Sequence, residues 1–481
     1  MTRHFLAMLA AGLAAFAVVQ PASAQPYDRP PPPAAPRPLQ IAAPQSATLP
    51  NGLRVVLAER HGVPIVSAQL LVLSGAEVDP PRQAGLASLT AGLLTRGTRG
   101  RSAPAQAAAA EALGGTLSSA AGWHESGVGI SVTTPRLAEA LALVAQAVTE
   151  PAFAQAEIDR LRAETLDELK VATTRPGTVA GQAVNRMLFG DGAYGHPASG
   201  TPKSLPRITR ADVLRLHQQR YRPDNAVLVL AGDIGMEQAL ALARRHFAAW
   251  RAPAGAVPAT PAVAGRPSTP LLTLVDMGDS GQAGVALALP LPAAGSPDLA
   301  AGQVANAVLG GGYSSRLNQE IRIKRGLSYG AGSALDARLS AGLLRAAVQT
   351  KNESAAEVVA LVQGEVDRLA TTPVPDDELA ARKATLIGGF SRSVETTDGL
   401  AAVLSALVVS GRPVAELTTR IATLSAVDSA AVLAYARSHF DTAGRRIAVA
   451  GDKRAFEAAL KATVKDGQAQ SVSAGELDLG D

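Results

Sequence analysis

The alternation of apolar and polar positions predicts strands followed by helices in each half of the chain. Apolar stretches at residues 53–57 and 66–72 predict β-strands, because the first follows an Asn-Gly turn and the second alternates in part. Residues 105–112 and 137–148 predict alanine-rich helices, the second with apolar residues at helical spacing. Strand runs followed by helix runs indicate an α+β fold with antiparallel sheets packed against helices.

The second half of the chain repeats landmarks of the first. Each half ends with a helix pattern, an apolar strand and Ala-Gly-Asp, at residues 227–233 and 447–452. An earlier helix start, at residues 156–159 and 377–380, keeps nearly the same distance from that tripeptide. Internal duplication is the simplest explanation of these repeated landmarks, so we expect two homologous modules.

A leader and proline-rich segments divide the chain. Residues 1–24 have a basic start, an apolar run and Ala-Ser-Ala before Gln25, which is typical of a cleaved secretory signal. The apolar run is too short for a bilayer span and no other stretch qualifies, so we expect no integral membrane segment in the mature chain. The expected boundaries are signal peptide 1–24, proline-rich tether 25–46, first module 47–250, linker 251–269, second module 270–465 and tail 466–481.

The amino-acid composition excludes several kinds of partner and catalytic group. Of 481 residues, 47% are hydrophobic, which is enough apolar material for more than one core. The net charge of +4 comes without dense basic runs carrying aromatic residues, so nucleic acid is not an expected partner. The chain has no cysteine, which excludes disulfides, thiolate ligands and a cysteine nucleophile. The glycines at 310–312 lack the Lys-Ser/Thr of a phosphate cradle.

Several short phrases occur in a fixed order. The first half contains Leu-Pro-Asn-Gly-Leu at 49–53, Gly-Leu-Ala at 85–87, Arg-Gly-Thr at 96–98 and Tyr-Arg-Pro-Asp-Asn at 221–225. The second contains Leu-Gly-Gly-Gly-Tyr-Ser-Ser-Arg-Leu at 309–317 and Gly-Leu-Ser-Tyr at 326–329. This set resembles the insulinase (pitrilysin) family of zinc peptidases, in its bacterial and mitochondrial-processing branch. The resemblance implies that the two modules form half of a clamshell chamber.

The resemblance also locates a zinc site whose ligands this chain lacks. Active members carry H-x-x-E-H on a helix, where two histidines hold zinc and the glutamate polarises water. Here Ser88 and Gly92 stand at the histidine positions and Ala91 at that of the base. The third ligand, a glutamate on a later helix, aligns with Leu161, although nearby glutamates leave that register open.

The seven histidines offer no replacement site. None pairs with another at ligand spacing, so a structural role is favoured for each. The most tempting cluster, Trp123-His124-Glu125, falls where the family has a strand, and adjacent residues of a strand point to opposite faces. We therefore expect this chain to bind no metal and no other cofactor.

The second half of the family normally supplies an arginine and a tyrosine that bind the substrate backbone beside the zinc. The corresponding positions are Arg322 and Tyr329. A helix carrying Arg322 can end at Gly326 while Tyr329 starts the next strand, so that both side chains converge on one carbonyl. Spacing alone would favour a surface arginine and a half-buried tyrosine, whereas the surrounding phrases favour the substrate site.

Loss of the zinc ligands with retention of the arginine and tyrosine predicts an active site that is shared between two subunits. We expect a non-catalytic, substrate-binding subunit that is inactive alone and completes the active site of a heterodimeric zinc endopeptidase. Its expected partners are a related subunit with an intact H-x-x-E-H, which carries the zinc, and a peptide or unfolded polypeptide. The export signal and the family layout indicate the periplasm. Two alternatives stay open: an independently active metallopeptidase with an unrecognised metal set, and a purely structural scaffold.

Overall fold

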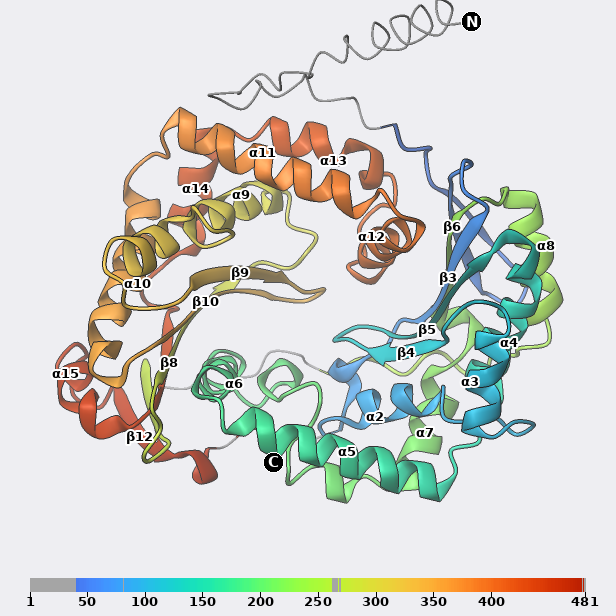
Figure 1. Ribbon diagram of the computed structural model, residues 1–481, viewed down its shortest axis with the longest axis horizontal. Helices are drawn as coiled ribbons and strands as arrows, with labels where there is room; N and C mark the ends of the chain where they lie inside the picture. Colours follow the sequence, from blue (N-terminus) through green and yellow to red (C-terminus); the bar gives the residue numbers. More distant parts are fainter. Residues whose placement is uncertain (1–39, 81, 262–266, 268–269, 478, 480–481) are drawn as a thin grey trace, which may run out of the picture. The chain divides into compact units, whose positions relative to one another are not determined.

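Two six-stranded sheets, each packed against helices, organise the chain (Figure 1). The computed structural model describes residues 40–80, 82–261, 267, 270–477 and 479. The expected signal peptide and most of the expected tether lie outside the described residues. The α+β class with two modules is confirmed.

The first sheet has the order β1-β2-β6-β3-β5-β4, with β2 and β6 parallel and the other neighbours antiparallel. β6 is buried along its whole length, because helices cover both faces of this sheet and its Val-Leu-Ala run suits such a place. The strands are β1 (Gln45–Thr48), β2 (Arg54–Glu59), β3 (Ile65–Val72), β4 (Ser118–Ala121), β5 (Ser126–Thr133) and β6 (Ala226–Gly232). The helices are α2 (Leu86–Leu93), α3 (Ala103–Glu111), α4 (Leu137–Thr149), α5 (Gln155–Thr173), α6 (Pro176–Phe189), α7 (Arg210–Arg220) and α8 (Met236–Phe247).

The second sheet has the order β12-β7-β11-β8-β10-β9, with β7 parallel to both β11 and β12. Apart from the edge strands β1 and β12, the two sheets share one strand order. The strands are β7 (Leu272–Asp276), β8 (Ala283–Leu291), β9 (Ala331–Ala337), β10 (Gly342–Thr350), β11 (Arg446–Gly451) and β12 (Ala469–Ser473). The helices are α9 (Leu299–Leu309), α10 (Ala355–Thr371), α11 (Asp376–Ser393), α12 (Thr397–Val409), α13 (Glu416–Ser425), α14 (Ser429–His439) and α15 (Glu457–Lys461).

Two helices cross between the modules. α6 packs on β8 and β11, and its Val184 and Met187 share a core with Ala286 of the second sheet. Gly284 on β8 permits this approach, because a Cβ there would lie 2.4 Å from the backbone nitrogen of Gly177. In return, α12 packs on β3 and β6 of the first sheet. Each sheet is therefore covered on one face by a helix that belongs, in sequence, to the other module.

The sequence predicts no integral membrane segment in the mature chain, and the described helices bear on that prediction. No single one of them is long and apolar enough to cross a membrane. α13 and α14 meet the length and composition criterion only as a pair, and that pair is bent by 101°.

Candidate functional site

α2 is the helix on which the sequence places the lost zinc site. Ser88 donates its hydroxyl to the carbonyl of Ala198 at 2.8 Å, and Ala91 is fully buried. A Cβ added to Gly92 would lie 3.0 Å from Cδ2 of Leu161 on α5. The structure thus brings Leu161 against Gly92, and an apolar side chain packs where the alignment puts a metal ligand.

Two buried carboxyls precede α2, and both bind backbone groups. Asp79 accepts hydrogen bonds from the nitrogens of Gly85 and Ala87, both at 2.8 Å, which satisfies free N–H groups at the start of α2. Burial raises the pKa of Asp79 well above its ordinary value. Glu77 accepts from the nitrogen of Gly75 at 2.8 Å, and burial raises its pKa to about 7 despite that bond. These carboxyls therefore fix the backbone before α2 and at its start.

The described residues contain no group of three or more His, Asp or Glu side chains arranged to hold a metal ion. The zinc of active relatives therefore does not fit the donors present around α2. Most of the histidines instead bond a nearby carboxylate or carbonyl. These bonds join His61 to Asp233, His196 to Pro197, His217 to Val148 and His439 to Asp298.

The prediction that Trp123-His124-Glu125 lies in a strand is wrong. These residues form the turn between β4, which ends at Ala121, and β5, which starts at Ser126. A turn lets His124 bond both modules: its Nε2 lies 2.5 Å from the hydroxyl of Tyr194 in the first module and accepts a 3.3 Å bond from the nitrogen of Leu339 in the second. Burial, and then Arg338, lower the pKa of His124 to about 4, so the ring is neutral near pH 7.

Arg338 reinforces the same junction from the turn between β9 and β10. Its Cζ lies 4.3 Å from the ring centroid of Trp123 and 4.7 Å from that of Tyr194. The side chain is 5% exposed, and its Nη2 pairs with Asp336 at 2.7 Å. A buried guanidinium stacked on aromatic rings contributes rigidity between the modules.

Arg322 lies between two tyrosine rings. Its Cζ is 4.8 Å from the ring centroid of Tyr329 and 5.0 Å from that of Tyr313. Tyr329 is 91% exposed and Tyr313 is 65% exposed. Arg322 belongs to a short π-helix, Asn318–Ile323, and Tyr329 precedes β9 by two residues. The expectation that Tyr329 starts the strand is wrong, because the strand ladder with β10 begins at Ala331.

Side chains of the second module fix the segment that carries Tyr313. Asn318 Nδ2 donates to the carbonyl of Tyr313 at 2.5 Å. Arg316, which is 8% exposed, pairs with Glu378 of α11 at 2.7 Å. A nearly buried ion pair with several hydrogen bonds holds this segment in one geometry.

The segment that carries Tyr329 is fixed from β10. Ser328 Oγ donates to the carbonyl of Gln349 at 2.7 Å, and Thr350 Oγ1 donates to that of Leu327 at 2.6 Å. The backbone on both sides of Arg322 is therefore held, while the two rings remain open to solvent.

The Arg322 cluster, defined as Arg322, Tyr313 and Tyr329, offers hydrogen-bond donors to a ligand. Among the described residues, no hydrogen bond or ion pair engages the side chain of Arg322; its partners are the two ring faces. Stacking on ring faces leaves the in-plane N–H donors free for an oxygen. Sequence reasoning gave Tyr313 no role, because its place in a glycine- and serine-rich phrase carries no signal of ring stacking.

Comparison with known proteins identifies the family of the chain. Residues 54–202 match the family described as Insulinase (Peptidase family M16), and residues 207–386 match Peptidase M16 inactive domain. An uncharacterized zinc protease of Mycobacterium tuberculosis is 32% identical, over 74% of this chain and 82% of that protein. A non-peptidase homolog of Helicobacter pylori is 25% identical, over 71% and 78%.

Solved structures show the same fold. A peptidase M16 inactive domain from Pseudomonas fluorescens superposes with a TM-score of 0.78 at 26% identity, covering 86% of this chain and 98% of that one. A protease from Helicobacter pylori has the same TM-score at 19% identity, covering 85% and 99%, which shows the likeness of fold alone. The chain therefore belongs to the insulinase family, peptidase family M16, as a non-catalytic member.

Proposed function

We propose that this chain is the substrate-binding subunit of a heterodimeric zinc endopeptidase, to which it contributes Arg322 and Tyr329. The observation that carries the proposal is the open state of the Arg322 cluster. Tyr329 leaves 91% of its surface in water, so its ring adds little to the stability of the fold. The chain nevertheless fixes the backbone on both sides of Arg322.

The cluster suits a peptide carbonyl. The guanidinium of Arg322 and the hydroxyl of Tyr329 are both donors, and together they can bind one carbonyl oxygen and the negative charge that develops on it. The partner subunit would hold the zinc, which polarises the carbonyl and activates water. Neither subunit then has a complete site, which accounts for an α2 without ligands.

An extended substrate also finds an edge strand here. β9 starts just past Tyr329 and is the last strand of its sheet. Peptides commonly bind by adding a strand to such an edge. This supports a peptide or unfolded polypeptide as the substrate, and the signal-like leader supports the periplasm as the place of action.

The test is reconstitution. The mature chain and a related subunit with an intact H-x-x-E-H are purified separately, then assayed alone and mixed on an unstructured fluorogenic peptide. We expect the mixture to cleave far faster than either chain. Arg322→Ala combined with Tyr329→Phe should lower that rate about 100-fold, the usual cost of losing oxyanion donors.

Arg437→Ala is the matched control, because Arg437 is exposed on α14 and bonds the carbonyl of Ala370. It should leave the rate unchanged. A mixture no faster than the zinc-bearing partner alone would contradict the proposal, as would an unaffected double variant. Stoichiometric zinc retained by this chain after dialysis would favour an independent peptidase.

A further inference from the structure

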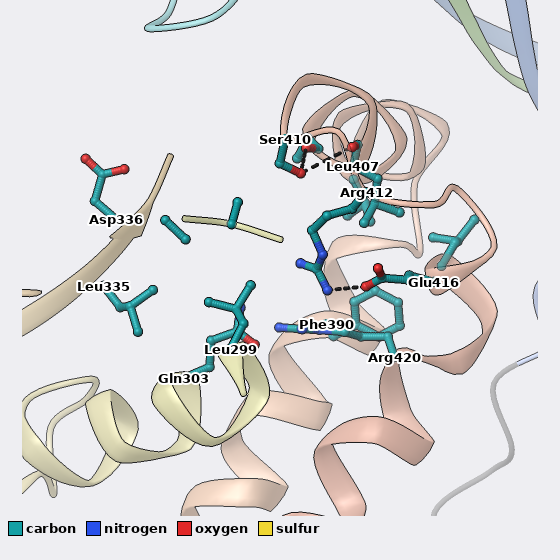
Figure 2. Close-up of a pocket in the computed structure, with 15 residues that line it drawn as sticks. Leu299, Gln303, Leu335, Asp336, Phe390, Leu407, Ser410, Arg412, Glu416 and Arg420 are labelled. Atoms are coloured by element: carbon teal, nitrogen blue, oxygen red, sulfur yellow. Dashed lines mark hydrogen bonds and ion pairs between the residues drawn. The ribbon is translucent and has the colours of Figure 1, made fainter. Parts of the chain in front are cut away.

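A cavity of about 460 Å³ lies in the second module between α9, the end of β9, α11, α12 and α13 (Figure 2). Much of its wall is apolar, with Leu299, Leu335, Phe390, Leu407 and Leu417 among the lining residues. The volume is in the range of small-molecule sites, about 300–1,000 Å³. No residue of the Arg322 cluster lines it, so it is separate from the proposed peptide site.

One side of the cavity carries an uncompensated positive charge. Arg412 and Glu416 line it and pair with each other. Arg420 also lines it, and among the described residues no hydrogen bond or ion pair engages its side chain, although the carboxylate of Glu416 is near enough to favour its charge. Figure 2 shows the side chain of Arg420 pointing across the cavity toward the α9 residues Leu299 and Gln303.

The surroundings of Arg420 disfavour its charged form. Burial, and then the neighbouring Arg412, lower the pKa of Arg420 from its ordinary value. A partly desolvated guanidinium normally has a carboxylate or phosphate as partner, because removing it from water is unfavourable. The carboxylate of Asp336, also in the wall, is engaged by Arg338 at 2.7 Å. The charged lining residues Asp336, Glu416, Arg412 and Arg420 sum to zero, and Arg338, which lies outside the wall and pairs with Asp336, brings the local net charge to +1.

We propose that this cavity binds a monocarboxylate with an apolar tail. The carboxylate receives the N–H donors of Arg420, and the tail lies against the leucines and Phe390. The C-terminal residue of an unblocked peptide and a free branched carboxylic acid share this chemistry. The charge complement is a single anion, because Glu416 already neutralises Arg412.

Calorimetric titration of the purified mature chain near pH 7.5 tests the site with three probes: N-acetyl-leucine, N-acetyl-leucinamide and 4-methylpentanoate. The two acids should bind, and the neutral amide should bind at least about tenfold more weakly, since it loses a charge-assisted hydrogen bond. Tighter binding of N-acetyl-leucine than of 4-methylpentanoate identifies a peptide terminus as the source, and the reverse order identifies a free acid. Equal binding of acid and amide, or no binding of any probe, overturns the proposal.

Two substitutions with opposite expected effects on acid binding test whether Arg420 receives the carboxylate. Arg420→Met keeps an apolar stem and should remove the preference for the acid, a loss of about tenfold or more in affinity. Glu416→Gln leaves Arg412 unopposed and should tighten acid binding several-fold. Arg437→Met is the control and should change nothing. If Arg420→Met does not fold, Glu416→Gln still decides, because unchanged or weaker acid binding in that variant contradicts the assignment.

Discussion

α2 in the first module and the stretch from α9 to β9 in the second occupy corresponding places and have opposite characters. α2 lies between β3 and β4 along the chain, and α9 lies between β8 and β9, which hold the same places in the second sheet. Around α2, Ala91 is buried and Gly92 packs against Leu161. After α9, Tyr313 and Tyr329 stand in solvent on either side of Arg322.

Under the proposed function, the first place is maintained for the fold and the second for a ligand. A helix that has lost its metal ligands can be absorbed into the core, because small and apolar side chains there gain from burial. Large exposed rings gain nothing comparable, so a clamped segment that presents them needs another reason to persist. The proposed substrate binding supplies that reason.

The largest expected effect concerns Glu77, on the closed side. Burial raises its pKa from an ordinary 4.5 to about 7, so its contribution to stability is complete below pH 4.5 and is lost as the pH rises through 7. Glu77→Gln cannot ionise and should exceed the wild type by on the order of 3 kcal/mol in unfolding free energy at pH 8. At pH 4 the two should be nearly equal. Urea unfolding at both pH values measures the difference.

Variant and wild type must be compared at each pH, because titration of His124 changes the stability with pH in the opposite direction to titration of Glu77. Burial lowers its pKa to about 4, so its contribution grows as the pH rises from 4 to 6.5 in both proteins. Glu111→Gln, at an exposed position of α3, is the control and should show the same difference at both pH values. An equal effect of Glu77→Gln at pH 4 and pH 8 would show that this carboxyl is not held neutral.

The next effect concerns Gly92, which the family resemblance aligns with a ligand position. Gly92→His should destabilise the chain by about 1–3 kcal/mol, because its Cβ would lie 3.0 Å from Leu161 and the core must move. Gly364→His is the matched control, since Gly364 is also helical and its added Cβ meets nothing within 4 Å. Adding Leu161→Ala should recover part of the loss in denaturant unfolding. Equal costs at the two glycines would mean that α2 is not closed by packing.

The sequence was enough to predict the fold class and the place of α2, because these depend on local patterns and ordered phrases. The strands at 53–57 and 66–72 appear as β2 and β3, and the helix at 137–148 as α4. Apolar periodicity does not say which surface a helix covers, so nothing in the pattern showed that α6 and α12 cover the sheets of the opposite modules. β12 was equally hidden, since its sequence Ala-Gln-Ser-Val-Ser is mostly polar, as suits an exposed edge.

Side-chain chemistry that depends on three-dimensional neighbours could be predicted least. Tyr313 and Tyr329 enclose Arg322 from two different loops, and only the fold brings them together. Arg420 looks like an ordinary helical surface arginine until the cavity beside α9 is seen. The sequence predicted a strand at His124, and the turn that it occupies instead lets it bond Leu339 in the other module.

The smallest expected effect separates Tyr313 from Tyr329 on the open side. Tyr313 offers Arg322 a ring face, so Tyr313→Leu should cost about 0.5–1 kcal/mol of positioning, a fall of about two- to fivefold in cleavage by the reconstituted mixture. Tyr313→Phe keeps the ring and should restore the rate, whereas Tyr329→Phe should not, because its hydroxyl is the proposed donor. In an Arg322→Ala background, Tyr313→Leu should have no further effect. A loss that persists in that background, or a Phe variant as slow as Leu, would mean that Tyr313 contacts the substrate or the partner directly and does not act through Arg322.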